Sequence, residues 1–76
     1  MKIKINSTED AYAGALALAL TASSIDETLQ YLSDAKTTRR LLNEPAIKRA
    51  KIRAIDFAME WWDVKSEYAL WRKCRD

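Results

Sequence analysis

The stretch that decides the fold is residues 45–71, which read PAIKRAKIRAIDFAMEWWDVKSEYALW. Apolar side chains recur in it every three or four residues, the period of a helix with an apolar face. These positions are Ile47, Ala50, Ala54, Phe57, Trp61, Val64, Tyr68 and Trp71. Pro45 suits the first turn of a helix, and neither glycine nor proline follows it. The pattern predicts one helix over 45–72, about 40 Å long.

A second apolar row runs beside the first along the same predicted helix. Its members are Ile52, Ile55, Met59, Trp62 and Ala69. The two rows together cover more than half of the helix circumference, which is more than one neighbouring helix can bury. We therefore expect this helix to be central, with other helices on different sides, or to be shared with another subunit.

Two shorter helices are predicted before it, over 8–22 and over 25–36. The first is apolar on every side, which is typical of a buried helix, and Asn6 or Ser7 provides its N-cap. Gly14 costs about 1 kcal/mol in its interior, which a close contact with another helix would offset.

The second of these helices starts with a capping box formed by Ser24 and Glu27. Its apolar stripe consists of Ile25, Leu29 and Leu32. An extension of this helix to residue 42 stays open, because the β-branched pair at 37–38 weakens the helical pattern. Ahead of both helices, residues 2–5 alternate Lys-Ile-Lys-Ile as an extended arm would. The arm is either a lead-in that packs Ile5 near the first helix or an edge that pairs with another chain.

The composition predicts an all-α fold, a small three-helix assembly in a single domain over residues 1–76. Glycine and proline occur once each, too few for the turns of an all-β domain. Cys74 is the one cysteine and histidine is absent, so we expect neither an internal disulfide nor a zinc site. We expect a reduced, cytoplasmic setting, without a signal peptide or a membrane-spanning segment.

The residue types also argue against catalysis. Without histidine the commonest general base is missing, and without a glycine-rich loop there is no nucleotide-phosphate cradle. We therefore expect no enzymatic activity, cofactor, metal or small-molecule substrate. Four carboxylates recur along one face of the long helix: Asp56, Glu60, Asp63 and Glu67. We interpret this row as a solvated face, with a divalent-cation site as the alternative.

Positive charge is concentrated in residues 36–53, where seven cations face a single acid, Glu44. The candidate residues for an acidic partner, nucleic acid above all, are Arg39, Arg40, Lys48, Arg49, Lys51 and Arg53. Several of them stand in the first turns of the long helix, where the helix dipole disfavours positive charge. The alternative interpretation is that they are solubilising and pair with acidic helices of a neighbouring subunit.

The C-terminal part carries a second candidate surface, which is aromatic. Its residues are Trp61, Trp62, Lys65, Tyr68, Trp71 and Arg72. Tryptophan and tyrosine beside arginine are typical of protein interfaces, although a stripe at helical spacing also fits a core. We therefore expect a small regulator or adaptor that binds a protein partner or forms a homodimer through this face. The alternatives are a nucleic-acid-binding module that uses residues 36–53 and a structural component of a larger assembly.

Overall fold

The computed structural model describes residues 3–75, which form four α-helices. They are α1 (Thr8–Leu20), α2 (Ile25–Arg39), α3 (Glu44–Met59) and α4 (Trp61–Arg75). The described range contains no strand, so the predicted all-helical class is confirmed. None of these helices is long and apolar enough to cross a bilayer.

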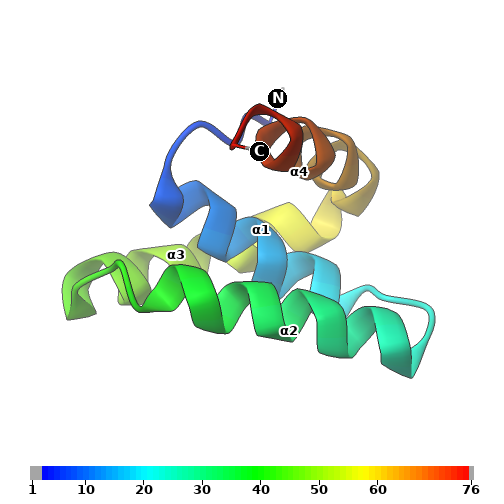
Figure 1. Cartoon of the computed structure of the whole chain (residues 1–76), viewed down its shortest axis with the longest axis horizontal. Helices are drawn as coiled ribbons and strands as arrows, with labels where there is room; N and C mark the ends of the chain where they lie inside the picture. Colours follow the sequence, from blue (N-terminus) through cyan, green and yellow to red (C-terminus); the bar gives the residue numbers. More distant parts are fainter. Residues whose placement is uncertain (1–2, 76) are drawn as a thin grey trace.

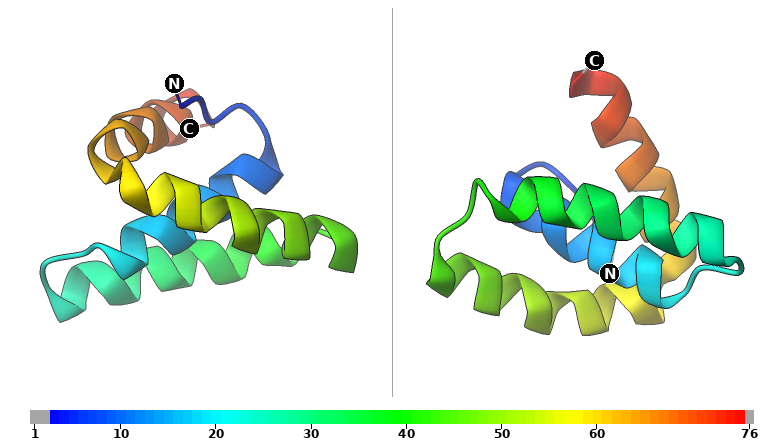
Figure 2. Two further views of the ribbon diagram at one scale, coloured as in Figure 1. Left: turned by 180° about the vertical axis from the view of Figure 1, so that it is seen from behind. Right: turned by 60° about the horizontal axis from the view of Figure 1, so that its bottom comes forward.

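The first helix, α1, lies at the centre of the fold (Figure 1). It packs against α2, α3 and α4, whereas α2 and α3 make little backbone contact with each other. A view from below shows α1 between α2 and α3 (Figure 2, right). The expectation that an all-round apolar helix is buried is thus confirmed. The expectation of a central C-terminal helix is wrong, because the narrow alanine-rich α1 takes that place.

Local capping determines where three of the helices begin. The Ser7 hydroxyl accepts a hydrogen bond from the Asp10 N–H at 3.1 Å, and Ser24 caps α2 in the same way at 3.2 Å from Glu27 N. Both predicted starts are confirmed. Asn43 caps α3 through its side-chain oxygen, 3.0 Å from the nitrogen of Ala46. These bonds satisfy N–H groups that a helix start leaves without partners.

The single helix predicted over 45–72 is wrong, because the chain bends at Glu60. This residue has φ −125° and ψ 48°, and its N–H donates to the Phe57 carbonyl at 3.1 Å. Its own carbonyl then accepts from the N–H groups of Asp63 and Val64, which starts α4. The predicted three-helix assembly is therefore a four-helix one, and its extents of 30 × 28 × 26 Å leave no room for a straight 40 Å helix.

Packing against α1 explains the bend, since no glycine or proline stands near it. A straight helix would carry Val64 and Tyr68 away from α1, whereas the bend buries both of them. Burial of a large side chain contributes about 1.5–3 kcal/mol, more than one interrupted helical turn costs. Most of the first predicted row is core, but Trp61 is exposed and Trp71 is half-buried.

The predicted close contact at Gly14 is with α4 and with the N-terminal segment. A β-carbon at this position would lie 3.4 Å from Tyr68 Cδ2, 3.6 Å from Val64 Cγ1 and 2.9 Å from Ile5 Cδ1. Ile3 and Ile5 are buried while Lys4 between them is exposed, which fits the lead-in interpretation of the arm. Lys2, the first residue of the alternating pattern, lies outside the described residues.

Candidate functional site

Two cations of the predicted basic surface, Arg49 and Arg53, form salt bridges with acidic residues of α1. The Arg49 guanidinium donates to both carboxylate oxygens of Glu9, at 2.9 and 3.4 Å. Arg53 forms a salt bridge with Asp10, which is 8% exposed. Both acids lie in the first turn of α1, so these pairs join the start of α1 to the middle of α3.

The Glu9–Arg49 pair changes the ionisation of both groups. The hydrogen bond from Arg49, opposed by some burial, lowers the pKa of the Glu9 carboxyl below its ordinary value. The same hydrogen bond raises the pKa of Arg49. Arg49 and Arg53 thus have acidic partners within the same chain.

The remaining cations of residues 36–53 lie on the last part of α2, in its connection to α3 and on the first half of α3. They are Lys36, Arg39, Arg40, Lys48 and Lys51. All five are exposed, and none forms a salt bridge with another residue of the part that the structure describes. Four of these unpaired cations, Arg39, Arg40, Lys48 and Lys51, belong to the six residues predicted for an acidic partner.

The difference between paired and unpaired cations gives a first prediction. Replacing Arg53 with alanine leaves the nearly buried Asp10 carboxylate without its partner and should lower the free energy of unfolding by about 1–2 kcal/mol. Lys51→Ala, two residues away on the same helix, should change it by less than about 0.5 kcal/mol. Urea unfolding of the two variants measures the difference. Equal losses would show that the pairing with Asp10 contributes nothing to stability.

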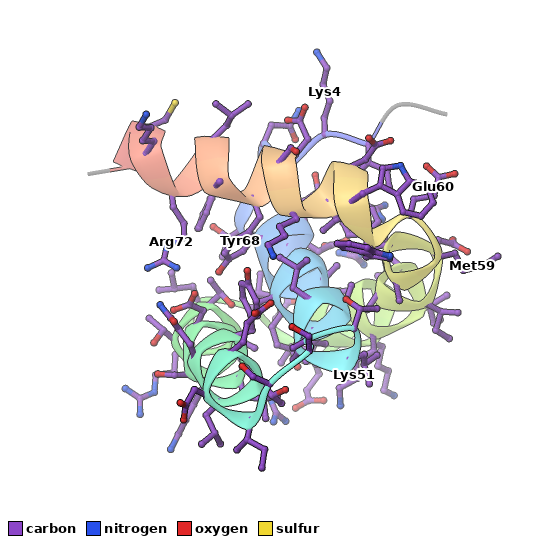
Figure 3. The ribbon with its side chains drawn as sticks, turned by 90° about the vertical axis from the view of Figure 1, so that its right-hand side faces the viewer. Lys4, Lys51, Met59, Glu60, Tyr68 and Arg72 are labelled. Atoms are coloured by element: carbon purple, nitrogen blue, oxygen red, sulfur yellow. The ribbon has the colours of Figure 1, made fainter. Side chains whose placement is uncertain are left out.

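Half of the predicted aromatic surface is occupied in holding α4 to α2 (Figure 3). The Tyr68 hydroxyl donates to Asp34 Oδ2 at 3.1 Å, and the Arg72 guanidinium donates to the same oxygen at 3.2 Å. Lys65 lies 3.7 Å from Glu27 Oε1. The Tyr31 ring packs edge-on against Tyr68, with centroids 5.9 Å apart.

These contacts make Tyr68 a structural residue. It is 3% exposed, and burial followed by the negative charge of Asp34 raises its pKa well above the ordinary value of 10.0. Neither Asp34 nor Tyr31 is among the residues predicted from the sequence. Tyr31 stands four residues before the buried Ala35, and this helical spacing is the signal that could have identified it, whereas the position of Asp34 carries no such signal.

Two of the three remaining aromatic residues of the predicted surface, Trp61 and Trp62, lie at the bend. Trp61 and Trp62 are 44% and 54% exposed and form an edge-to-face pair with centroids 6.1 Å apart. Met59, also exposed, precedes them at the end of α3 (Figure 3). We call Met59, Trp61 and Trp62 the corner. Trp71 instead lies half-buried against Tyr68, with centroids 5.9 Å apart.

The acidic row predicted along one helix face does not exist, because the bend separates its members. Asp56 lies on α3, Glu60 forms the bend, and Asp63 and Glu67 belong to α4. The described residues contain no group of three or more carboxylates, or of other ligand side chains, that could hold a metal ion. Nothing in this part of the molecule supports the alternative of a divalent-cation site.

An apolar groove that the sequence did not predict lies on the side of α1 that faces away from α4. Its floor is α1 itself, and α2 and α3 form its walls, with a cavity of about 390 Å³. Its apolar lining includes Leu16, Ala19, Leu20, Leu32, Ala54 and Ile55. The stripe of Ile25, Leu29 and Leu32, which suggested a packed face of α2, is exposed. Lys51 also lines the groove, so it borders the unpaired cations.

Comparisons with other proteins add no relative. No known protein family, no curated protein and no solved structure matches this chain. The candidate surfaces therefore rest on the exposure and chemistry of this chain's own residues, and there are two of them. They are the groove with its neighbouring cations and the corner.

Proposed function

We propose that this chain is a non-enzymatic protein–protein interaction module, a small regulator or adaptor that binds another protein or a second copy of itself. The observation that carries the proposal is the number of large apolar side chains left in water. These are Leu20, Ile25, Leu29, Leu32, Leu41, Ile52, Ile55, Met59, Trp61, Trp62 and Leu70. A cytoplasmic setting suits the exposed Cys74 thiol, which would stay reduced there.

The composition of the core supports this proposal. α1 is buried mainly through alanines, while the leucines and isoleucines of α2 and α3, except Ile47, are exposed. Monomeric proteins seldom leave contiguous apolar patches larger than a few hundred Å² in water, and larger patches mark interaction sites. The proposal therefore rests on apolar surface that intramolecular packing leaves uncovered.

Two double variants test which surface binds. The groove variant carries Leu20→Gln and Ile55→Gln, and the corner variant carries Met59→Gln and Trp62→Gln. All four residues are more than half exposed, so we expect both variants to fold with little loss of stability. Each protein is used for affinity capture from the native host, and sedimentation at high micromolar concentration measures self-association. We expect a captured protein, or a dimer, that is lost with at least one variant.

The controls are circular dichroism of each variant and nuclease treatment before capture. If the wild-type chain sediments as a monomer and captures the same proteins as both variants, the interaction proposal is wrong. Loss of capture with the groove variant alone would assign the function to the groove. Loss with the corner variant alone would assign it to the aromatic surface.

A second candidate function is nucleic-acid binding, which the five unpaired cations favour. It predicts binding of DNA or RNA whose affinity falls as the salt concentration rises, because the release of counterions from the nucleic acid becomes less favourable. Arg40→Ala and Lys48→Ala should each reduce the slope of log affinity against log salt by about 1. Arg53→Ala is the wrong test, because it breaks the salt bridge with Asp10. Absence of binding at low salt would exclude this candidate.

A further inference from the structure

We infer that the groove between α2 and α3 binds an acidic amphipathic helix of a partner protein. This inference rests on the proposed function and names the surface and the partner chemistry. α1 is covered by α2, α3 and α4 on three sides, and the groove is its remaining open side. A helix placed there would become the fourth neighbour of α1.

The shape of the groove suits a helix. Because α2 and α3 make little backbone contact with each other, the groove opens between them, with Leu16, Ala19 and Leu20 of α1 as its floor. The lining covers about one turn of each wall, from Thr28 to Leu32 on α2 and from Lys51 to Ile55 on α3, and the exposed Ile25 and Leu29 continue the apolar stripe of α2 beyond it. Leu20, Leu32 and Ile55 are 73, 45 and 63% exposed. These side chains can accept the apolar face of a helix, a common mode of peptide recognition.

The charge next to the groove selects the partner. Lys36 and Arg39 follow Leu32 at spacings of four and seven, and Lys48 and Lys51 precede Ile55 at the same two spacings. All four therefore lie on the helix faces that form the groove. Lys36, Arg39 and Lys48 lie toward its end at the α2–α3 connection, and Lys51 lies halfway along α3. They are exposed and without salt bridges in the described residues. Carboxylates at one end of a bound helix would complement them.

Other occupants fit these residues less well. A nucleic-acid backbone would contact the cations but leave Leu20 and Ile55 in water. A flat bilayer surface would reach the exposed walls but not the floor around Ala19 and Leu16. A second copy placed groove to groove in the same direction would set the same cations against each other, because Glu44 is the one acid among residues 36–53.

The test is a selection from a displayed library of 15-residue amphipathic helices. Their apolar face is built from leucine, isoleucine and alanine, and their flanking positions vary between glutamate and lysine. We expect the selected peptides to carry glutamate toward one end. The best peptide, made synthetically, should bind about tenfold more weakly to the Lys48→Glu/Lys51→Glu variant. Binding should be lost with the groove variant.

The matched control is Lys4→Glu with Lys73→Glu, which makes the same charge change away from the groove. Lys4 lies on the opposite side of the molecule from Lys51 (Figure 3), and this control should keep wild-type affinity. No enrichment, enrichment of lysine, or binding that survives in the groove variant would overturn the inference. So would tight binding of anionic phospholipid vesicles or duplex DNA in the absence of any selected acidic peptide.

The two proposals fail in different ways. If no acidic helix is selected but host proteins are captured and lost with the corner variant, the groove inference is wrong and the interaction module stands. If capture and self-association are both absent, the interaction module itself is wrong.

Discussion

Replacing Tyr68 with alanine is expected to separate α4 from the rest of the fold and to lower the free energy of unfolding by about 3–5 kcal/mol. The ring is buried against Gly14 and packs on Tyr31 and Trp71. Its hydroxyl binds Asp34 on α2. Alanine removes all of these contacts at once and leaves a cavity beside α1. A domain of this size has little more stability than that to lose.

The three tryptophans make the effect easy to localise. Trp61, Trp62 and Trp71 all belong to α4, so their fluorescence reports on the position of this helix, while circular dichroism reports on all four helices. In urea we expect the Tyr68→Ala fluorescence transition to precede the circular-dichroism transition, as in a loss of two-state behaviour. Coincident transitions with wild-type midpoints would contradict the assigned role of Tyr68.

The conservative variant Tyr68→Phe separates the ring from the hydroxyl. It keeps the packing, loses the hydrogen bond to Asp34, and should cost about 1 kcal/mol at neutral pH. The substitution should also change how the free energy of unfolding depends on pH above about 10. Because the pKa of Tyr68 is higher in the fold than its ordinary value of 10.0, its contribution is complete below about pH 10 and is lost as the pH rises further. Stability of the phenylalanine variant should therefore fall less steeply above pH 10, and equal slopes would argue against a buried, neutral phenol.

Replacing Gly14 with leucine is the second change with a large expected effect, a loss of about 3 kcal/mol. A β-carbon there already meets Ile5 and Tyr68 at or inside normal contact distance. The rest of a leucine side chain would have to push α4 and the N-terminal segment away from α1. Thermal unfolding of the variant, followed by tryptophan fluorescence, measures this loss.

Gly14→Ala is the matched control. Its single methyl group gains about 1 kcal/mol of helix propensity, and the end of the flexible Ile5 side chain can move to accommodate it. We expect the stability of this variant to stay within about 1 kcal/mol of wild type. A leucine variant as stable as the alanine variant would show that α4 does not lie closely on Gly14.

Local sequence patterns predicted where α1 and α2 start. They did not predict the bend at Glu60, because that bend depends on packing between residues far apart in the sequence. Ser7 and Ser24 cap helices through bonds that span three residues, so the sequence nearby contains all the information. The bend at Glu60 has no local signal, since its φ and ψ require no special residue. It exists because α1 stands where α4 can pack on it. The periodic pattern that continues from Phe57 to Val64 therefore predicted one helix where there are two.

The candidate surfaces were only partly predictable for the same reason. Arg49 binds Glu9 across 40 residues of sequence, and this pairing depends on how α1 and α3 are packed. The apolar stripe of α2 indicated a buried face, yet the side that packs on α1 carries Ala35 and Thr38 instead. The groove arises from this difference, because leucines that the pattern assigns to a core lie beside an open side of α1.

The weak contact between α2 and α3 has a consequence for how selective the groove can be. Its width depends on two separate contacts with α1 rather than on one rigid α2–α3 interface. The two walls are joined closely at residues 40–43, so they can spread most at the opposite end, near Leu20. If the groove binds a partner helix as proposed, we expect it to accept apolar side chains of different sizes, as flexible binding surfaces do. Discrimination among partners would then come from the placement of charge, and less from an exact fit of shape.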